Sequence, residues 1–81
     1  MKYVIVKNKY GYECAILFDG LLDHGLFGRQ RVVAAGFCDV KGATIDGYNN
    51  PTTSYWGRSV TLSLSARPED AEVIDRLINQ R

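Results

Sequence analysis

The sequence predicts an α+β domain: a single twisted, mostly antiparallel sheet of about five strands, with one C-terminal helix packed on one face. Two patterns near the end of the chain predict this class. Apolar and polar residues alternate over 60–65, which is typical of a strand with one buried face. Residues 68–80 then repeat apolar side chains at helical spacing, so a single amphipathic helix follows the strand and covers the sheet.

The length and composition predict one folded domain over residues 1–81. A chain of 81 residues is too short to form two separate cores, and its 46% hydrophobic and 23% charged residues are close to globular averages. Ten Lys and Arg against nine Asp and Glu give a net charge of +1. This balance argues against a protein that gains most of its affinity from a phosphate backbone.

The first two strands are predicted over 3–7 and 12–18, joined as a hairpin. Both runs are rich in β-branched and aromatic residues, and Gly11 between them can adopt the positive φ that the turn requires. Alternation in the second strand places Ile16 on one face and Leu17 on the other. Both faces of this strand are therefore partly apolar.

The connection over 21–27 is predicted to fold over an open edge of the core as a hydrophobic plug, because its apolar residues cannot lie together in water. These residues are Leu21, Leu22, Leu26 and Phe27. In the same segment, His24 is expected to hydrogen-bond to a neighbouring backbone group rather than to bind a metal or act in catalysis.

The longest predicted strand covers 31–40 and is followed, after a tight turn, by another over 43–48. Ala34, Ala35 and Gly36 leave the middle of the longer strand without large side chains. A strand centre of this kind loses packing unless a helix or a second backbone approaches closely. We therefore expect such an approach at these three residues.

Residues 49–58 are predicted as a loop, because Asn, Pro, Ser, Thr and Gly dominate the segment. The last strand is predicted over 59–65, with Val60, Leu62 and Leu64 pointing inward.

The helix is predicted from Pro68 to Gln80. Proline suits the first helical turn, and the acidic residues that follow match the positive end of the helix dipole. One side of this helix carries apolar side chains and is expected to pack on the sheet. These residues are Ala71, Ile74, Leu77 and Ile78, and Val73 widens this side.

No group of residues has the spacing of a catalytic or metal site, so we expect neither enzymatic activity nor a cofactor. Two cysteines, Cys14 and Cys38, and one histidine, His24, are too few for a structural zinc site. Both cysteines lie in apolar, strand-like runs, where buried, reduced thiols are more common than disulfides. The enzymatic alternative is a cysteine nucleophile activated by His24, which thiol alkylation tests.

The candidate binding residues are aromatic and basic. Trp, Tyr and Arg dominate binding hot spots because they bury a large area with few rotatable bonds and also form hydrogen bonds. The alternative for Trp56 is that it covers one end of the core, because so small a chain needs its single tryptophan there. The predicted partner-binding residues are Trp56, Tyr55, Arg58, Tyr48, Arg29 and Arg31.

One helix of about 13 residues, roughly 20 Å long, cannot cover both faces of the predicted sheet. Either segment 21–27 covers the second face or another copy of the chain does, and we expect a homodimer. The N-terminal apolar run is too short for a signal peptide, and no stretch reaches the roughly 20 apolar residues of a membrane span. We therefore expect no membrane partner and a cytoplasmic location.

The chain begins Met-Lys-Tyr-Val-Ile-Val-Lys and ends in a strand, Ser-Ala-Arg-Pro-Glu-Asp-Ala and a helix. This arrangement, chiefly over Val60–Ile78, resembles the small open reading frames of bacteriophages and prophages. The resemblance implies an accessory protein that binds and blocks a host machine, including a defence system. The leading hypothesis is therefore a small non-enzymatic interaction protein with an inhibitory role.

The alternative hypothesis is a nucleic-acid-binding module, in which aromatic rings stack on bases and arginines contact phosphates. Its residues are Tyr55, Trp56, Arg29, Arg31 and Arg58.

Overall fold

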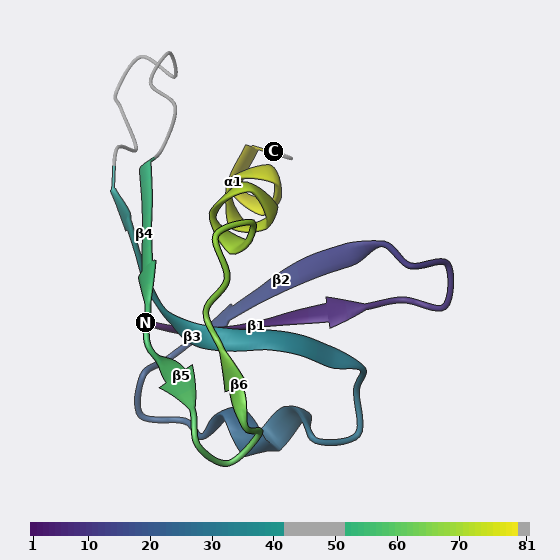
Figure 1. Cartoon of the computed structure of the whole chain (residues 1–81). Helices are drawn as coiled ribbons and strands as arrows, with labels where there is room; N and C mark the ends of the chain where they lie inside the picture. Colours follow the sequence, from purple (N-terminus) through teal and green to yellow (C-terminus); the bar gives the residue numbers. More distant parts are fainter. Residues whose placement is uncertain (42–51, 80–81) are drawn as a thin grey trace.

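The computed structural model describes residues 1–41 and 52–79, which form an α+β fold (Figure 1). Its elements are, in chain order, β1 (Lys2–Lys7), β2 (Glu13–Phe18), the short 3-10 helix η1 (His24–Phe27), β3 (Val32–Lys41), β4 (Thr52–Trp56), β5 (Arg58–Ser59), β6 (Leu64–Ser65) and α1 (Asp70–Asn79). Four strands form one antiparallel sheet in the order β2-β1-β3-β4, and β5 and β6 form a second, two-stranded sheet. The predicted class is confirmed, and the strands are shared between two sheets rather than one.

The predicted first hairpin is confirmed. β1 and β2 pair in register from Lys2 opposite Phe18 to Lys7 opposite Glu13. Gly11 has a φ of 88° in the turn between them, a value that side chains larger than hydrogen rarely allow.

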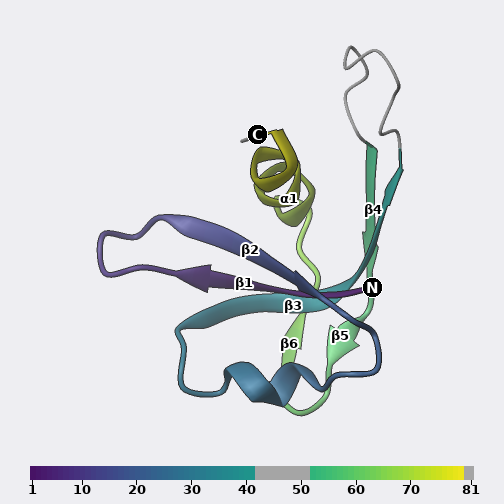
Figure 2. The ribbon, with the colours of Figure 1, turned by 180° about the vertical axis from the view of Figure 1, so that it is seen from behind.

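The sheet is covered on both sides, by α1 on one and by η1 on the other (Figures 1 and 2). On the α1 side, Tyr3, Ile5 and Ile74 are fully buried in the main core cluster. In β1 and β3, Val4 and Ala35 are also fully buried. Because adjacent residues of a strand point to opposite faces, Val4 lies on the η1 side of the sheet. The segment after β2 therefore covers part of the second face within a single chain.

The close approach expected at the small residues of β3 is confirmed at Gly36. A Cβ atom placed there would lie 2.6 Å from the carbonyl oxygen of Trp56 and 3.1 Å from the Cβ of Ala66. It would also lie 3.3 Å from the ring of Tyr3. Gly36 therefore marks the point where the chain leading into and out of the small sheet crosses β3.

Two predictions around the second half of the chain concern the loop over 49–58 and the strand over 43–48. The loop prediction is wrong for residues 52–56, which form β4 and pair with β3. The Thr, Tyr and Trp in this stretch favour an extended backbone, and pairing with β3 outweighs the polar composition. The strand predicted over 43–48 lies outside the described residues.

The single strand predicted over 59–65 is also wrong, because a tight turn interrupts it. The backbone N–H of Leu62 donates to Ser59 Oγ at 3.2 Å, and the N–H of Ser63 donates to the carbonyl of Val60 at 3.2 Å. Ser63 has a φ of 55°. Serine side chains that bond to nearby backbone compete with strand pairing, so Val60 lies at the turn and is exposed rather than inward.

The helix begins at Asp70, two residues later than predicted, and continues through Asn79, the last described residue. Ile74 is fully buried and Ile78 packs against the core cluster, as expected. Val73, which was expected to widen the packed side, is also buried. Leu77 differs from the prediction, because it is 40% exposed at the margin of the helix beside β2.

Candidate functional site

The single tryptophan of the chain, Trp56, is the last residue of β4 and lies opposite Phe37 of β3. The two rings are stacked, with 6.3 Å between centroids and 17° between planes. Trp56 is still 46% exposed. One face of the indole therefore covers Phe37, and much of the remaining ring stays available to a partner.

The turn after Trp56 is held in place by a glycine. Gly57 has a φ of 80°, and a Cβ atom at this position would lie 2.8 Å from the Phe37 ring. Larger residues are excluded by both the backbone conformation and the ring. This bend directs the chain from the edge of the large sheet into β5.

His24 is buried beneath the same aromatic residues. Its Nε2 lies 2.8 Å from the carbonyl oxygen of Gly36, and because a carbonyl only accepts, Nε2 carries the proton. Phe18 and Phe37 meet the imidazole edge to face, with centroids 5.5 Å and 5.7 Å away. The predicted bond to a backbone group is confirmed, although the partner lies on β3 rather than in the same segment.

The prediction that segment 21–27 covers the core with its apolar side chains is wrong for three of the four residues. Phe27 packs on Phe18, with 5.0 Å between the ring centroids, but Leu21, Leu22 and Leu26 are exposed. His24, held by its hydrogen bond to Gly36, is buried in this segment, where the leucines were expected to be buried.

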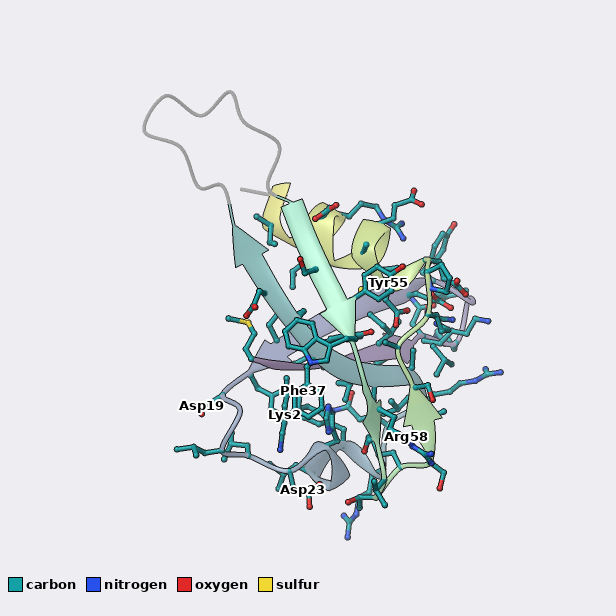
Figure 3. The ribbon with its side chains drawn as sticks, turned by 60° about the vertical axis from the view of Figure 1, so that its left-hand side comes forward. Lys2, Asp19, Asp23, Phe37, Tyr55 and Arg58 are labelled. Carbon is teal, nitrogen blue, oxygen red and sulfur yellow. The ribbon has the colours of Figure 1, made fainter. Side chains whose placement is uncertain are left out.

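A groove of about 370 Å³ opens beside this aromatic group (Figure 3). It lies between the segment leading into η1, the start of β1 and the β5–β6 turn, and we call it the Arg58 groove. Its lining residues are Lys2, Leu21, Asp23, His24, Phe37, Arg58, Ser59, Val60 and Thr61.

The Lys2 side chain crosses the Arg58 groove. Its ammonium group donates to the carbonyl oxygen of Leu22 at 2.7 Å and lies 6.0 Å from the centroid of the Phe37 ring. Arg58 is exposed. The groove therefore contains one tethered cation and one exposed cation, together with the side chains of Leu21, Phe37 and Val60.

Asp23 is the carboxylate of the groove, and it is engaged by neighbouring groups. The backbone N–H of Gly25 donates to its Oδ1 at 2.8 Å, and this bond lowers the pKa of Asp23 below its usual value, with a smaller contribution from a hydrogen bond to the Thr61 side chain. A carboxylate held ionised in this way is a poor general acid. Its contacts link η1 to the β5–β6 turn.

A second group of charged residues lies on the opposite side of the sheet and is structural. Asp70 is fully buried and accepts hydrogen bonds from the Tyr3 hydroxyl at 2.5 Å and from Arg67 Nε at 2.8 Å. Arg67 also forms a bidentate pair with Glu13, whose nearer contact is 2.7 Å. Burial and the bond to Asp70 raise the pKa of Tyr3, and the hydrogen bond from Arg67 lowers the pKa of Glu13. The group ties the helix start to β1 and β2.

The enzymatic alternative of a cysteine paired with His24 gains no support from the geometry. Cys38 is buried as predicted, and burial raises the pKa of its thiol, which disfavours the reactive thiolate. Cys14 is exposed, contrary to the prediction that both thiols are buried, because its neighbour Ala15 points into the core cluster and Cys14 points to the other face of β2. In residues 1–41 and 52–79, no three His, Cys, Asp or Glu side chains gather as metal ligands do.

The six predicted partner-binding residues do not form one site. Trp56 and Arg58 lie together, since Arg58 lines the groove that contains the Phe37 ring beneath Trp56. Tyr55 points to the other face of the sheet and packs against the core cluster. Tyr48 lies outside the described residues.

Arg29 and Arg31 lie before the start of β3, whereas Trp56 lies beside its second half. The rise of about 3.3 Å per strand residue places roughly 20 Å of backbone between Arg31 and Phe37. Three residues of the groove were not predicted from the sequence as binding residues: Lys2, Leu21 and Val60. Leu21 and Val60 were assigned to the core because apolar residues are usually buried, and no pattern in the sequence marks them as exceptions.

Comparison with known protein families, curated proteins and solved structures finds no match for this chain. Across the part of the chain that the structure describes, no helix is both long and apolar enough to cross a membrane.

Proposed function

We propose that this chain is a small non-enzymatic module that binds another protein through the Arg58 groove and the adjoining Trp56. One observation carries the proposal: large apolar side chains lie in water around a groove with charged residues. Leu21 is 93% exposed and Val60 is 79% exposed, and both line the groove. Exposed apolar surface rimmed by polar groups is typical of protein contact sites.

The residue types of this surface favour a protein partner. A half-exposed tryptophan and an exposed arginine are the side chains most often found at binding hot spots. The stack of Trp56 on Phe37 holds the indole in position before a partner arrives, which lowers the entropy lost on binding.

The ionisable groups of the groove suit binding better than catalysis. Asp23 accepts a backbone hydrogen bond, His24 donates to Gly36, and Lys2 donates to Leu22. Each is already engaged with backbone groups, so none is free in this geometry to exchange a proton with a substrate.

The bacteriophage-like character of the sequence suggests the class of partner. The proposed partner is a protein of the bacterial host, such as a component of a defence complex, which is inhibited when its surface is covered. A partner of this kind places the chain in the host cytoplasm.

A homodimer is a further part of this proposal, and the edge of the large sheet supports it. β2 is the terminal strand of the order β2-β1-β3-β4, so its outer backbone groups have no strand partner among the described residues. Edge strands of this kind pair readily with another copy of the same strand. Sedimentation at increasing concentration is expected to show a dimer that Cys14→Lys disrupts, since an edge lysine opposes pairing; a monomer at every concentration contradicts the homodimer.

The groove is tested by capture of a host protein from lysate on the immobilised chain. Leu21→Asp and Val60→Asp are expected to abolish capture without changing the melting temperature, because both side chains are exposed. The control is Tyr10→Asp, another mostly exposed side chain, in the β1–β2 turn, which should retain capture. Equal loss in the control, or full capture by the groove variants, would exclude the groove as the binding site.

A further inference from the structure

A second exposed surface lies at the other end of the molecule, where the β1–β2 turn projects from the sheet (Figures 1 and 2). Backbone hydrogen bonds bring its segments together: the N–H of Lys7 donates to the carbonyl of Arg31 at 2.9 Å, and the N–H of Asn8 donates to the carbonyl of Tyr12 at 2.9 Å. We call it the hairpin surface. It consists of Lys7, Lys9, Tyr10, Tyr12, Arg29 and Arg31.

The hairpin surface carries concentrated positive charge. Residues 7–12 and 28–31 hold four of the ten cations of the chain and none of its nine acids. None of these four cations forms a salt bridge with another described residue. Glu13, which lies opposite Lys7 in the pairing of β1 with β2, is itself paired with Arg67 at 2.7 Å. Although the net charge of the chain is only +1, the hairpin surface is therefore strongly basic.

Two tyrosines lie among these cations. Tyr10 is 73% exposed and Tyr12 is 70% exposed, and the ammonium group of Lys9 lies 5.0 Å from the Tyr10 ring centroid. The side chain of Asn8 holds the turn, because its Oδ1 accepts from the backbone N–H groups of both tyrosines, at 2.9 Å and 3.0 Å. The turn is thus fixed in shape while both tyrosine side chains remain mostly exposed to solvent.

We propose that the hairpin surface binds single-stranded nucleic acid, with Tyr10 and Tyr12 stacking on bases and the surrounding lysines and arginines contacting phosphates. Exposed aromatic rings among cations that form no salt bridge with the described residues complement a single strand, which has a flat base at each nucleotide and a charge at each phosphate. An anionic membrane would instead favour aliphatic side chains at the tip, where this turn has Asn8 and Gly11. The site shares no residue with the Arg58 groove and does not depend on the protein-binding proposal.

Fluorescence anisotropy with a labelled single-stranded oligonucleotide of about 12 nucleotides tests the site. Binding at low salt is expected, and four phosphate contacts predict that log K falls with log salt concentration with a slope of about −2 to −3. Tyr10→Ala and Tyr12→Ala should each weaken binding about ten-fold, the loss expected for one stacked base. Both side chains are exposed, so the variants should keep the wild-type melting temperature.

A charge-matched pair of double variants separates a local site from general attraction. Lys9→Ala with Arg31→Ala removes two charges from the hairpin surface, and Lys2→Ala with Arg58→Ala removes two from the Arg58 groove. Only the first pair is expected to weaken binding strongly. An equal loss in both, or no effect of the tyrosine variants, would overturn the proposal.

The single tryptophan provides an internal check. Trp56 lies far from the hairpin surface, so its fluorescence should change little when the oligonucleotide binds. Strong quenching would place the strand on Trp56 and overturn the assignment, as would the absence of binding at low salt. Preferential binding to anionic lipid vesicles over the oligonucleotide would assign the surface to membranes instead.

Discussion

The Arg58 groove with Trp56 and the hairpin surface, at two ends of the molecule, carry the same residue types, aromatic and basic, in different surroundings. At one end, Trp56 is stacked on Phe37, and the Lys2 ammonium is tethered to a backbone carbonyl. At the other end, Tyr10 and Tyr12 are exposed among cations that form no salt bridge with the described residues. The first surface is partly built into the fold, and the second projects from it.

This difference shows that residue type alone does not define a binding site. Arg29, Arg31 and Arg58 were predicted as parts of one surface, but the length of β3 divides them between two. The surroundings of each end suggest different partners: a protein where apolar side chains accompany the charge, and a polyanion where they do not.

The largest expected effect on stability is at Asp70, which holds Arg67 in position to pair with Glu13. Asp70→Ala should lower the free energy of unfolding by about 3 to 4 kcal/mol, because it leaves the Tyr3 hydroxyl and the Arg67 guanidinium without their buried partner. Urea denaturation measures the loss. Glu72→Ala, an exposed acid in the first turn of the same helix, is the control and should cost only about 0.5 kcal/mol. A similar loss in both variants would show that helix charge, rather than the buried group, matters.

The second largest expected effect on stability is at Gly36, where the chain crosses β3 before it forms the Arg58 groove. Gly36→Ala should destabilise the protein by about 2 to 3 kcal/mol, since the new methyl group would press on the carbonyl of Trp56. Gly20→Ala provides the contrast, because no heavy atom lies within 4 Å of the added Cβ. Chemical denaturation of the two variants compares them, and a wild-type midpoint for Gly36→Ala would contradict the close crossing.

The aromatic residues of the two ends should differ in their effect on stability. Trp56→Ala should cost about 1 to 2 kcal/mol, because about half of the indole is buried against Phe37. Tyr10→Ala should change stability by less than about 0.5 kcal/mol, because its ring is exposed. Thermal unfolding distinguishes them. Equal effects would mean that the two ends are built alike.

The smallest expected effect is a pH dependence from Glu13. Its pKa is lowered in the folded protein, chiefly by the hydrogen bond from Arg67, so the pair stabilises the fold above the ordinary value of 4.5 and loses this contribution as the pH falls below it. The loss should be about 1 kcal/mol, as for a bidentate pair near the surface. Unfolding measured across this range in Glu13→Gln should lack that part of the pH dependence, and an unchanged profile would argue against the ion pair.

Local patterns in the sequence predicted the fold well where neighbours in the chain decide it. The first hairpin follows from two β-rich runs around Gly11, and the helix follows from its spacing of apolar residues. The missing side chain at Gly36 predicted that another segment approaches β3 closely there, but it did not predict which segment.

The sites were harder to predict because they depend on contacts between distant segments. The alternation over 60–65 indicated a strand, but the bond from Leu62 to Ser59 Oγ turns the chain and exposes Val60. The burial of His24 depends on the carbonyl of Gly36, a partner that no spacing reveals. The separation of the arginines became apparent only once the strands were placed in order.

The hydrogen bond between Tyr3 and Asp70 joins residues 67 positions apart in the chain. Closing so long a loop has a larger entropic cost than closing a short one, so this contact should form late during folding, after the β1–β2 hairpin. The start of the helix then docks on a sheet that already exists. A refolding rate limited by this final closure would be slowed little by changes at the hairpin tip, and much more by changes at the two residues that meet last.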